Sequence, residues 1–576
     1  MTKVIVRSYL SPTLVLLAMD WPDGADRKDF LGFAIRRTPP FRSGDAPVTI
    51  DGKKWNWLPN RLGFEGPAPE GHDLPTDRAP IQKFMWWDAR IDEDQPGSKF
   101  TYVIAPVVGK PNQFGLVDAD SASIDVQLPL HVVDGIGTYF NRAVVSSQAF
   151  AKRVDQLRKA SGGKLTDEDI VALRTWLSNG LGEAVGAFLS EANAIEGAVY
   201  HFSDDIWVTP AVDGRVQKTT LVIDWKSVKD EETGEKVFPN QPIKDWLKPN
   251  KKVKLYDRTR GKIMHNKILI AHDADGPATL LCGSANFTTG GLTSQANVVH
   301  TFASRALSTH YQERVDRLKD NPTMSSIGAG ADWTPMETVG SAGIRAFFSP
   351  EKDPARVSMD AIVRAIHSSR SSVLFCLFTP TDDLLRDACF AAGDNGKMMF
   401  GLVNNISEPK DDADDSRADV RANVELYHRS RDQKDVFDKS WYGEPPEGFW
   451  VEKELFPGER YPGYPPVLIH HKFIVIDGET SAPVVFSGSA NMSGSSLYNN
   501  DENILEIRGS QSIARTYMAE FLRLYEHYRA RAIWERMHAE GRISTYKLQP
   551  DAQWAKDDYI PGTAKYRSRR AMTREP

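Results

Sequence analysis

Two stretches of the chain are alike: residues 265–273 read HNKILIAHD and residues 470–477 read HHKFIVID. Each is followed by Gly-Ser-Ala-Asn, at residues 283–286 and 488–491, and 18 residues separate the first histidine from the glycine in both copies. A single His-x-Lys triplet is more often a solvent-facing pair on a strand. Two copies in the same register indicate an internal repeat, and this repeat is the best guide to the fold.

The apolar run after each lysine predicts a buried β-strand. A histidine and a lysine two positions apart on a strand project from the same face, so the two copies present His265 with Lys267 and His470 with Lys472. The residue between them, His471 in the second copy, should point away. The small-residue turn offers hydroxyl, amide and backbone N–H donors that suit phosphate oxygens. These donors are Ser284, Asn286, Ser489 and Asn491.

Two such lobes facing one another would place one imidazole on each side of a phosphorus atom. That arrangement suits in-line displacement, in which one histidine attacks to form a phosphohistidine and the other protonates the leaving oxygen and then activates water. The lysines would stabilise the negative charge that accumulates on the phosphate. This chemistry requires neither a metal ion nor another cofactor, and we expect none.

The duplicated pattern resembles the signature of the phospholipase D superfamily, and the resemblance covers about residues 133–540. That signature is His-x-Lys, four residues, then Asp, with Gly-Ser-x-Asn downstream. The resemblance implies hydrolysis or exchange of phosphodiesters of lipids or nucleic acids through a covalent histidine intermediate. It also implies His265 as the nucleophile and His470 as the general acid and base. The second copy matches in full, at His470, Lys472, Asp477, Gly488, Ser489 and Asn491.

The first copy departs from the signature in its carboxylates. His272 stands where Asp477 does. Asn297 likewise stands where Glu502 does, each 32 residues after its own histidine. A carboxylate beside an imidazole orients the ring and favours its cationic form. Because only the second copy has both carboxylates, an alternative assignment makes a carboxylate-backed His470 the residue that carries the phosphoryl group.

Alternating helices and apolar strands from about residue 133 predict an α/β fold with two phospholipase D-like lobes, in which helices flank the sheets and a pseudo-twofold relates the lobes. The expected lobes span residues 133–335 and 340–545. Before them, short β-rich runs separated by Pro, Gly and Asp predict an all-β sandwich of immunoglobulin or fibronectin type over residues 1–130, as an accessory domain. Residues 546–576 form the expected C-terminal tail, with a frayed basic end from about residue 560.

Helices are expected over residues 166–194, where Thr166 can cap the first turn, and over residues 513–537. The second lobe should carry an insertion, because its motif lies further from its first strand than in the first lobe. This insertion contains the acidic run 411–415, interpreted as a solvated loop, and an aromatic loop at 441–464. The aromatic loop either packs beneath a long connection or lines the mouth of the site as a lid.

Composition narrows the class of protein. The 576 residues are 41% hydrophobic and 26% charged, which is typical of a globular protein, and the net charge of −6 is unlike that of a strongly basic nucleic-acid binder. Three cysteines form no metal-type or disulfide pattern, so they should be buried apolar residues in a reducing compartment. No signal peptide or transmembrane segment is evident, which favours the cytoplasm, although secretion without a cleavable signal is compatible with the same observations.

Three functions are therefore considered. The first is a hydrolase of phospholipid phosphodiesters, with contact to a membrane surface. The second is a nuclease with the same site, using a groove to which Arg258, Arg260, Lys262, Arg421 and Arg429 contribute. The third is an inactive phosphate-binding or scaffold module. Because one chain holds both His-Lys pairs, a monomer is expected. His272, His300 and His471 are expected to be structural.

Overall fold

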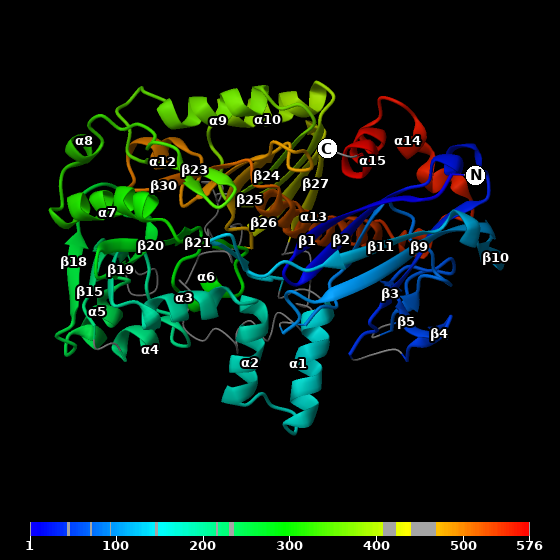
Figure 1. Cartoon of the computed structure of the whole chain (residues 1–576), viewed down its shortest axis with the longest axis horizontal. Helices are drawn as coiled ribbons and strands as arrows, with labels where there is room; N and C mark the ends of the chain where they lie inside the picture. The colour runs from blue at the N-terminus through cyan, green and yellow to red at the C-terminus, as the bar shows by residue number, and fades with distance from the viewer. Residues whose placement is uncertain are drawn as a thin grey trace.

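The computed structural model describes residues 2–42, 46–69, 72–92, 94–144, 148–214, 217–229, 235–406, 422–438 and 468–574. Two α/β lobes and an all-β unit make up the chain, as predicted, and the N-terminal strands lie beside the C-terminal helices (Figure 1). The acidic run 411–415 and the aromatic loop 441–464 lie outside the described residues.

The all-β unit is built on two main sheets that share a core, with a small additional sheet of β6 (Pro59–Asn60) and β7 (Leu74–Pro75). Its β2 and β3 strands are largely buried, and side chains such as Val15, Phe33 and Ile104 meet between the main sheets. One sheet has the order β1 (Ile5–Ser11), β2 (Leu14–Asp20), β8 (Met85–Asp88). The other has the order β10 (Gln113–Leu116), β9 (Lys99–Lys110), β3 (Phe30–Thr38), β5 (Lys53–Trp57), β4 (Val48–Ile50), with β11 (Ala122–Gln127) also paired to β9.

The first lobe is built on an eight-stranded sheet. Its central strands are continuous apolar runs, because helices and the other lobe cover both faces. The order of its strands is β12 (Val132–Val133), β13 (Ile136–Phe140), β21 (Val298–Phe302), β20 (Gly276–Gly283), β19 (Lys267–Asp273), β14 (Ala194–Val199), β15 (Thr219–Asp224), β18 (Val253–Arg258).

The second lobe repeats this order in a nine-stranded sheet, which is the internal repeat seen from the backbone. The two sheets diverge at their far edge, since β18 runs parallel to β15 whereas β26 runs antiparallel to β25 and pairs with an additional strand. The strand order is β22 (Glu337–Val339), β23 (Ala342–Phe348), β30 (Asn503–Arg508), β29 (Val484–Gly488), β28 (Lys472–Ile476), β24 (Ser372–Leu377), β25 (Met398–Ile406), β26 (Ala422–His428), β27 (Ser430–Asp438).

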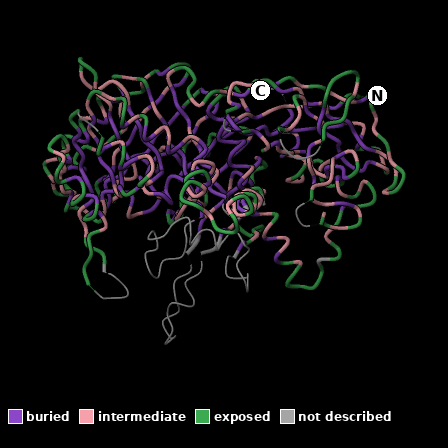
Figure 2. Tube along the Cα trace, turned by 90° about the horizontal axis from the view of Figure 1, so that it is seen from below, coloured by how far each residue is buried: buried purple, intermediate pink, exposed green. Residues whose placement is uncertain are grey.

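Helices surround the two sheets, and buried residues concentrate through the middle of the molecule (Figure 2). In the first lobe they are α1 (Gln148–Ala160), α2 (Asp167–Ser178), α3 (Leu181–Glu191), α4 (Val208–Asp213), α5 (Gln241–Leu247), α6 (Thr289–Leu292), α7 (Arg305–Lys319) and α8 (Met324–Ile327). In the second lobe and beyond they are α9 (Val357–His367), α10 (Asp383–Asp394), α12 (Gly494–Tyr498), α13 (Gln511–Ala539), α14 (Lys556–Tyr559) and α15 (Ala564–Thr573).

One expectation about the helices needs correction. The segment 166–194 is not one helix, because Asn179 and Gly180 adopt left-handed backbone conformations that separate α2 from α3. Thr166 does cap α2, in a reciprocal capping box with Asp169. No helix among the described residues has both the length and the apolar character needed to cross a bilayer.

A frayed basic end was expected from about residue 560, but the described part of this segment, to residue 574, is folded. Helix α15 packs on β1 and β2, and Met572 is fully buried. The Tyr9 hydroxyl donates to the Met572 carbonyl oxygen at 2.9 Å, and Arg569 pairs with the buried Asp20. Helix α15 is rich in basic residues, yet one of its faces is buried against β1 and β2. The periodicity of the sequence did not reveal this face. The domain boundaries at 130, 335 and 545 stay predictions.

Candidate active site

The two His-Lys pairs meet where the lobes join. Strands β19 and β28 begin at Lys267 and Lys472, and each histidine lies two residues earlier. The imidazole rings of His265 and His470 lie 6.5 Å apart between centroids, at an interplanar angle of 72°. Short bridges on either side, Met264 with Asp501 and Ala296 with Ile469, tie the lobes together at this point.

Each histidine is held by a residue of the opposite lobe. The Nδ1 atom of His265 lies 2.7 Å from Oε2 of Glu502. The Nδ1 atom of His470 lies 2.9 Å from Oδ1 of Asn297. Both partners are fully buried, so neither interaction is screened by solvent. With Nδ1 engaged, the Nε2 atom of each ring remains to meet a substrate.

This crossed pairing corrects the expectation that the carboxylates of the second copy serve His470. Glu502 belongs to the second lobe but supports His265 of the first lobe. His470 is backed by a neutral amide instead. In the sequence, Asn297 follows His265 and Glu502 follows His470 at the same spacing. In the structure, the pseudo-twofold packing of the lobes places each of these residues beside the histidine of the other lobe.

The two serines support these partners. Ser284 donates from Oγ to Oδ1 of Asn297 at 2.8 Å, and Ser489 donates to Oε2 of Glu502 at 2.9 Å. Their hydroxyls therefore orient the groups behind the histidines, whereas the sequence suggested a direct cradle for phosphate. Asn286 and Asn491 are not engaged in this way, and the amide oxygen of each is buried without a hydrogen-bond partner among the described residues. Because an amide oxygen only accepts, a phosphate at this turn would be bound by the amide N–H groups.

The lysines are buried beside their histidines in matching positions. Lys267 donates from Nζ to the carbonyl oxygen of His265, and Lys472 donates to that of His470, each at 2.6 Å. Neither lysine side chain forms an ion pair with a carboxylate of the described residues, and both have a relative exposure of 0%. Two such positive charges in a site that excludes water favour an anionic ligand.

Asp477 lies apart from this group. It follows β28, and its carboxylate accepts hydrogen bonds from the backbone N–H groups of Arg370, Ser371 and Ser372 at 2.7–3.0 Å. Lys472 lies at the opposite end of that strand, and five residues of strand extend about 17 Å. Asp477 therefore organises the start of β24. The structure does not bring it to the histidines.

Burial and charge shift the titration of the site. Burial lowers the pKa of His265 to about 4, although Glu502 opposes the shift. Burial lowers the pKa of Lys267 to about 7, again against Glu502. Burial and the adjacent Lys472 hold the pKa of His470 well below its usual range. Burial raises the pKa of Glu502, but His265, Lys267 and the hydrogen bond from Asn500 together lower it below its usual value.

Sequence reasoning missed two aromatic residues beside the site. The Tyr200 ring lies 4.9 Å from His265 and under Lys267, and the Phe378 ring lies 5.4 Å from His470 and under Lys472. Each directly follows the strand that pairs with its lobe's lysine strand. Only the strand register discloses Tyr200 as the counterpart of Phe378.

A buried ion cluster next to the site was also missed. Asp501, adjacent to Glu502, pairs with Arg258 at 2.8 Å and with Arg314 at 3.3 Å, and all three side chains are at most 3% exposed. Its carbonyl oxygen accepts from the His265 backbone N–H. The cluster joins the lobes and fixes the backbone around His265. Arg258 is consequently unable to line a nucleic-acid groove as expected.

The remaining histidines and the cysteines are structural in their surroundings. His300 hydrogen bonds to the Tyr517 hydroxyl at 2.7 Å inside the core, and His272 hydrogen bonds to Gln312 on the surface side. His471 packs against the rings of Phe140 and Phe473. All three cysteines are buried and free. In the described parts of the chain, no group of three or more His, Cys, Asp or Glu residues is arranged to hold a metal ion.

Comparison with known proteins finds a family model that matches both lobes. The family model described as "Cardiolipin synthase, PLD-like domain" matches residues 217–319 and 362–525, and each matched segment contains one His-Lys pair and its Gly-Ser-Ala-Asn turn. The chain belongs to the phospholipase D superfamily. Members of this superfamily are enzymes that act on phosphodiesters. A comparison with curated proteins gave no match.

Solved structures from the superfamily are among those similar to this chain. Phosphatidylserine synthase from Haemophilus influenzae Rd KW20 is 10% identical, with 64% of this chain and 93% of that chain covered and a TM-score of 0.40. Nuc from Salmonella typhimurium is 15% identical, with 33% and 93% covered and a TM-score of 0.19. Polyphosphate kinase from Porphyromonas gingivalis is 15% identical, with 56% of this chain but only 46% of the kinase covered and a TM-score of 0.32.

Proposed function

We propose that this chain cleaves phosphodiesters through a covalent phosphohistidine on His265, with His470 as the general acid and base. One observation carries the assignment: the buried carboxylate of Glu502 backs His265, whereas the neutral amide of Asn297 backs His470. A nucleophilic imidazole gains positive charge as it bonds to phosphorus, and a carboxylate at Nδ1 stabilises that charge. A general acid must release its proton readily, and a neutral partner permits this.

In the first step, Nε2 of His265 attacks phosphorus and the bond from phosphorus to the leaving oxygen breaks. Nε2 of His470 gives its proton to that oxygen, so the products are an alcohol and a phosphorylated His265. In the second step, His470 takes a proton from water, the water oxygen bonds to phosphorus and the bond from phosphorus to His265 breaks. The 6.5 Å separation of the rings leaves room for a phosphorus atom between them.

Lys267, Lys472, Asn286 and Asn491 would bind the non-bridging phosphate oxygens. The lysines supply two charges from opposite sides, and the asparagine amides supply donors from the two Gly-Ser-Ala-Asn turns. Glu502, Asn297 and the serines act by positioning. Because one chain supplies both halves, we propose that the monomer is active. Asp477 has no part in this proposal.

The substrate class we favour is a phospholipid. The net charge of −6 does not attract nucleic acid, and burial removes Arg258 from the basic groove that a nuclease would need. The matching family model also carries the description cardiolipin synthase. A nuclease is the second candidate, favoured by Arg260 and Lys262, which are exposed in the segment just before His265.

A substrate panel separates these candidates. We expect the purified protein, with chelator present, to cleave phospholipids in mixed vesicles and to leave single- and double-stranded DNA and RNA intact. If instead nucleic acid is cut, and the rate falls steeply as salt is raised, the nuclease assignment replaces the lipid one. No cleavage of any diester would support the inactive binding module.

The pH dependence of kcat/KM tests the electrostatics of the free site. As pH falls through about 4, His265 gains a proton and loses the lone pair that attacks phosphorus. As pH rises, His470, whose pKa is held well below its usual range by burial and Lys472, loses the proton that it must give to the leaving oxygen. As pH rises through about 7, Lys267 also loses the charge that attracts the phosphate. We therefore expect a bell-shaped profile with its maximum below neutrality. A value of kcat/KM that keeps rising between pH 7 and pH 9 would contradict the assignment.

A further inference from the structure

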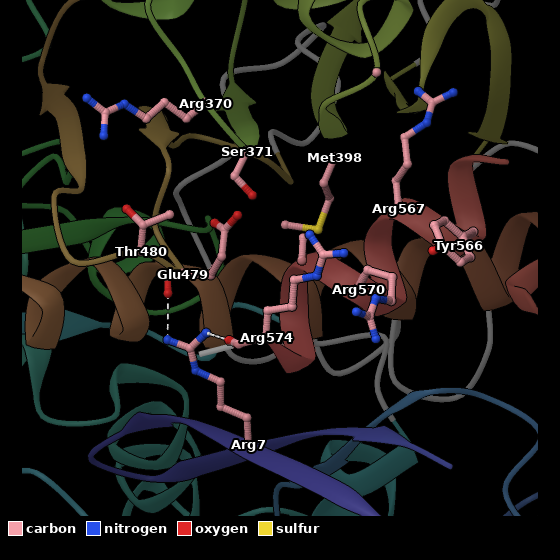
Figure 3. A pocket seen from close by; sticks show the side chains of 12 residues that line it. Arg7, Arg370, Ser371, Met398, Glu479, Thr480, Tyr566, Arg567, Arg570 and Arg574 are labelled. Atoms are coloured by element: carbon pink, nitrogen blue, oxygen red, sulfur yellow. Dashed lines mark hydrogen bonds between the residues drawn. The ribbon is translucent and has the colours of Figure 1, made fainter. Parts of the chain in front are cut away.

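A second cavity of about 310 Å³ lies away from the histidines, where the all-β unit, the second lobe and the C-terminal helix meet (Figure 3). Arg7 reaches it from β1, Arg370 from the turn before β24, and Glu479 from the turn after β28. The C-terminal segment contributes three further arginines, which are Arg567, Arg570 and Arg574.

The lining of this cavity is strongly positive in a chain whose net charge is negative. Five arginines face one carboxylate, that of Glu479. This carboxylate can balance only one of the five charges; one of its oxygens accepts a hydrogen bond from Ser372 and the other is buried without a hydrogen-bond partner among the described residues. The Nε atom of Arg570 is likewise buried without a partner. Arg570 also lies 3.7 Å from the buried Asp20, yet the cavity keeps an excess of guanidinium groups and one unmatched donor, and both favour an anion.

The walls of the cavity are fixed in place. Arg7 donates to the carbonyl oxygens of Glu479 and Arg574, at 2.5 and 2.6 Å, which joins three separate parts of the chain. Arg567 donates to the carbonyl oxygens of Gly393 and Gly562. The Asp477 carboxylate holds the backbone of residues 370–372. The guanidinium groups of Arg7 and Arg567 and the backbone at Arg370 are therefore held in place before any ligand arrives, which reduces the entropy lost on binding.

We propose that this cavity is a binding site for a small ligand bearing phosphate groups, separate from the site of the histidines. The planar guanidinium presents paired N–H donors that match phosphate oxygens, and several of them suit a ligand with more than one negative charge. The volume is at the lower end for small-molecule sites, which fits a short polyphosphate or the phosphate of a lipid headgroup rather than a bulky organic anion.

The test uses two probes with the full chain. Sodium tripolyphosphate is titrated calorimetrically, and phosphatidylcholine vesicles with and without phosphatidate are tested by co-sedimentation. The pocket variant is Arg370→Gln/Arg574→Gln, which removes two exposed arginines of the cavity. The control is Arg78→Gln/Arg364→Gln, which removes two exposed arginines elsewhere and keeps the same net charge. Phosphodiester cleavage is measured in both variants to show that each is folded.

We expect the pocket variant to bind tripolyphosphate at least about tenfold more weakly than the wild type, while the control binds as the wild type does. If the pocket variant also binds phosphatidate vesicles more weakly, a lipid headgroup can supply the phosphate. If it binds only the vesicles more weakly and tripolyphosphate as before, a lipid headgroup is the preferred ligand. Equal binding of both probes by the wild type and the pocket variant would overturn the proposal, as would an equal loss in both variants.

Discussion

Replacing His265 by alanine should lower kcat for the cleaved diester by on the order of 10⁴-fold or more, because no atom remains to form the bond to phosphorus. His470→Ala should behave differently. It removes the proton donor, so its effect depends on the leaving group. With a p-nitrophenyl diester, whose leaving oxygen needs no proton, the variant should still release a first equivalent of nitrophenol and then stall.

Stopped-flow absorbance checks both variants, and His272→Ala is the matched control, since this histidine occupies the first copy but lies at the surface bonded to Gln312. The control should retain full turnover. A burst of nitrophenol from His265→Ala together with none from His470→Ala would reverse the two roles. Unchanged turnover in both variants would contradict the assignment of the active site to these histidines.

Glu502→Gln should lower kcat by about 10²- to 10⁴-fold while the protein stays folded, since the substitution removes the negative charge and keeps the shape. Glu502 raises the pKa of His265 against the effect of burial. Without that charge the pKa of His265 falls further, so the acid limb of kcat/KM should move to lower pH. If Glu502 had a purely structural role, the Glu502→Gln variant would be less stable but its acid limb of kcat/KM would not shift.

Glu351→Gln is the control for this substitution. Glu351 is also a buried glutamate of the second lobe, and it accepts hydrogen bonds from the backbone at the start of α9 rather than from a histidine. We expect this variant to lose stability and to keep the wild-type pH profile. A shift of the acid limb in the control equal to that in Glu502→Gln would contradict the direct action of Glu502 on His265.

The sequence predicted the repeat, the two lobes and the meeting of the His-Lys pairs, because these follow from local patterns. Apolar runs specify strands, and a spacing of two places histidine and lysine on one face of a strand. Residues that pack locally were predicted equally well, such as Thr166 at its helix cap.

The partners of the histidines could not be predicted from the same patterns. Glu502 lies 32 residues after His470 and yet contacts His265, 237 residues away, because the choice is made by the twofold packing of the lobes. The same holds for Asp501 with Arg258, and for the C-terminal helix, whose polar composition concealed a face buried on β1 and β2. Long-range contacts of this kind leave no periodic signal in one sequence.

The most direct measurement locates the phosphorus adduct. The wild-type protein is mixed with a slowly hydrolysed diester, quenched in alkali because phosphohistidine is labile in acid, digested and analysed by tandem mass spectrometry. We expect a substituted phosphoryl group on His265. An adduct on His470 would contradict the crossed assignment of Glu502 and Asn297, and the absence of any histidine adduct during turnover would contradict covalent catalysis itself.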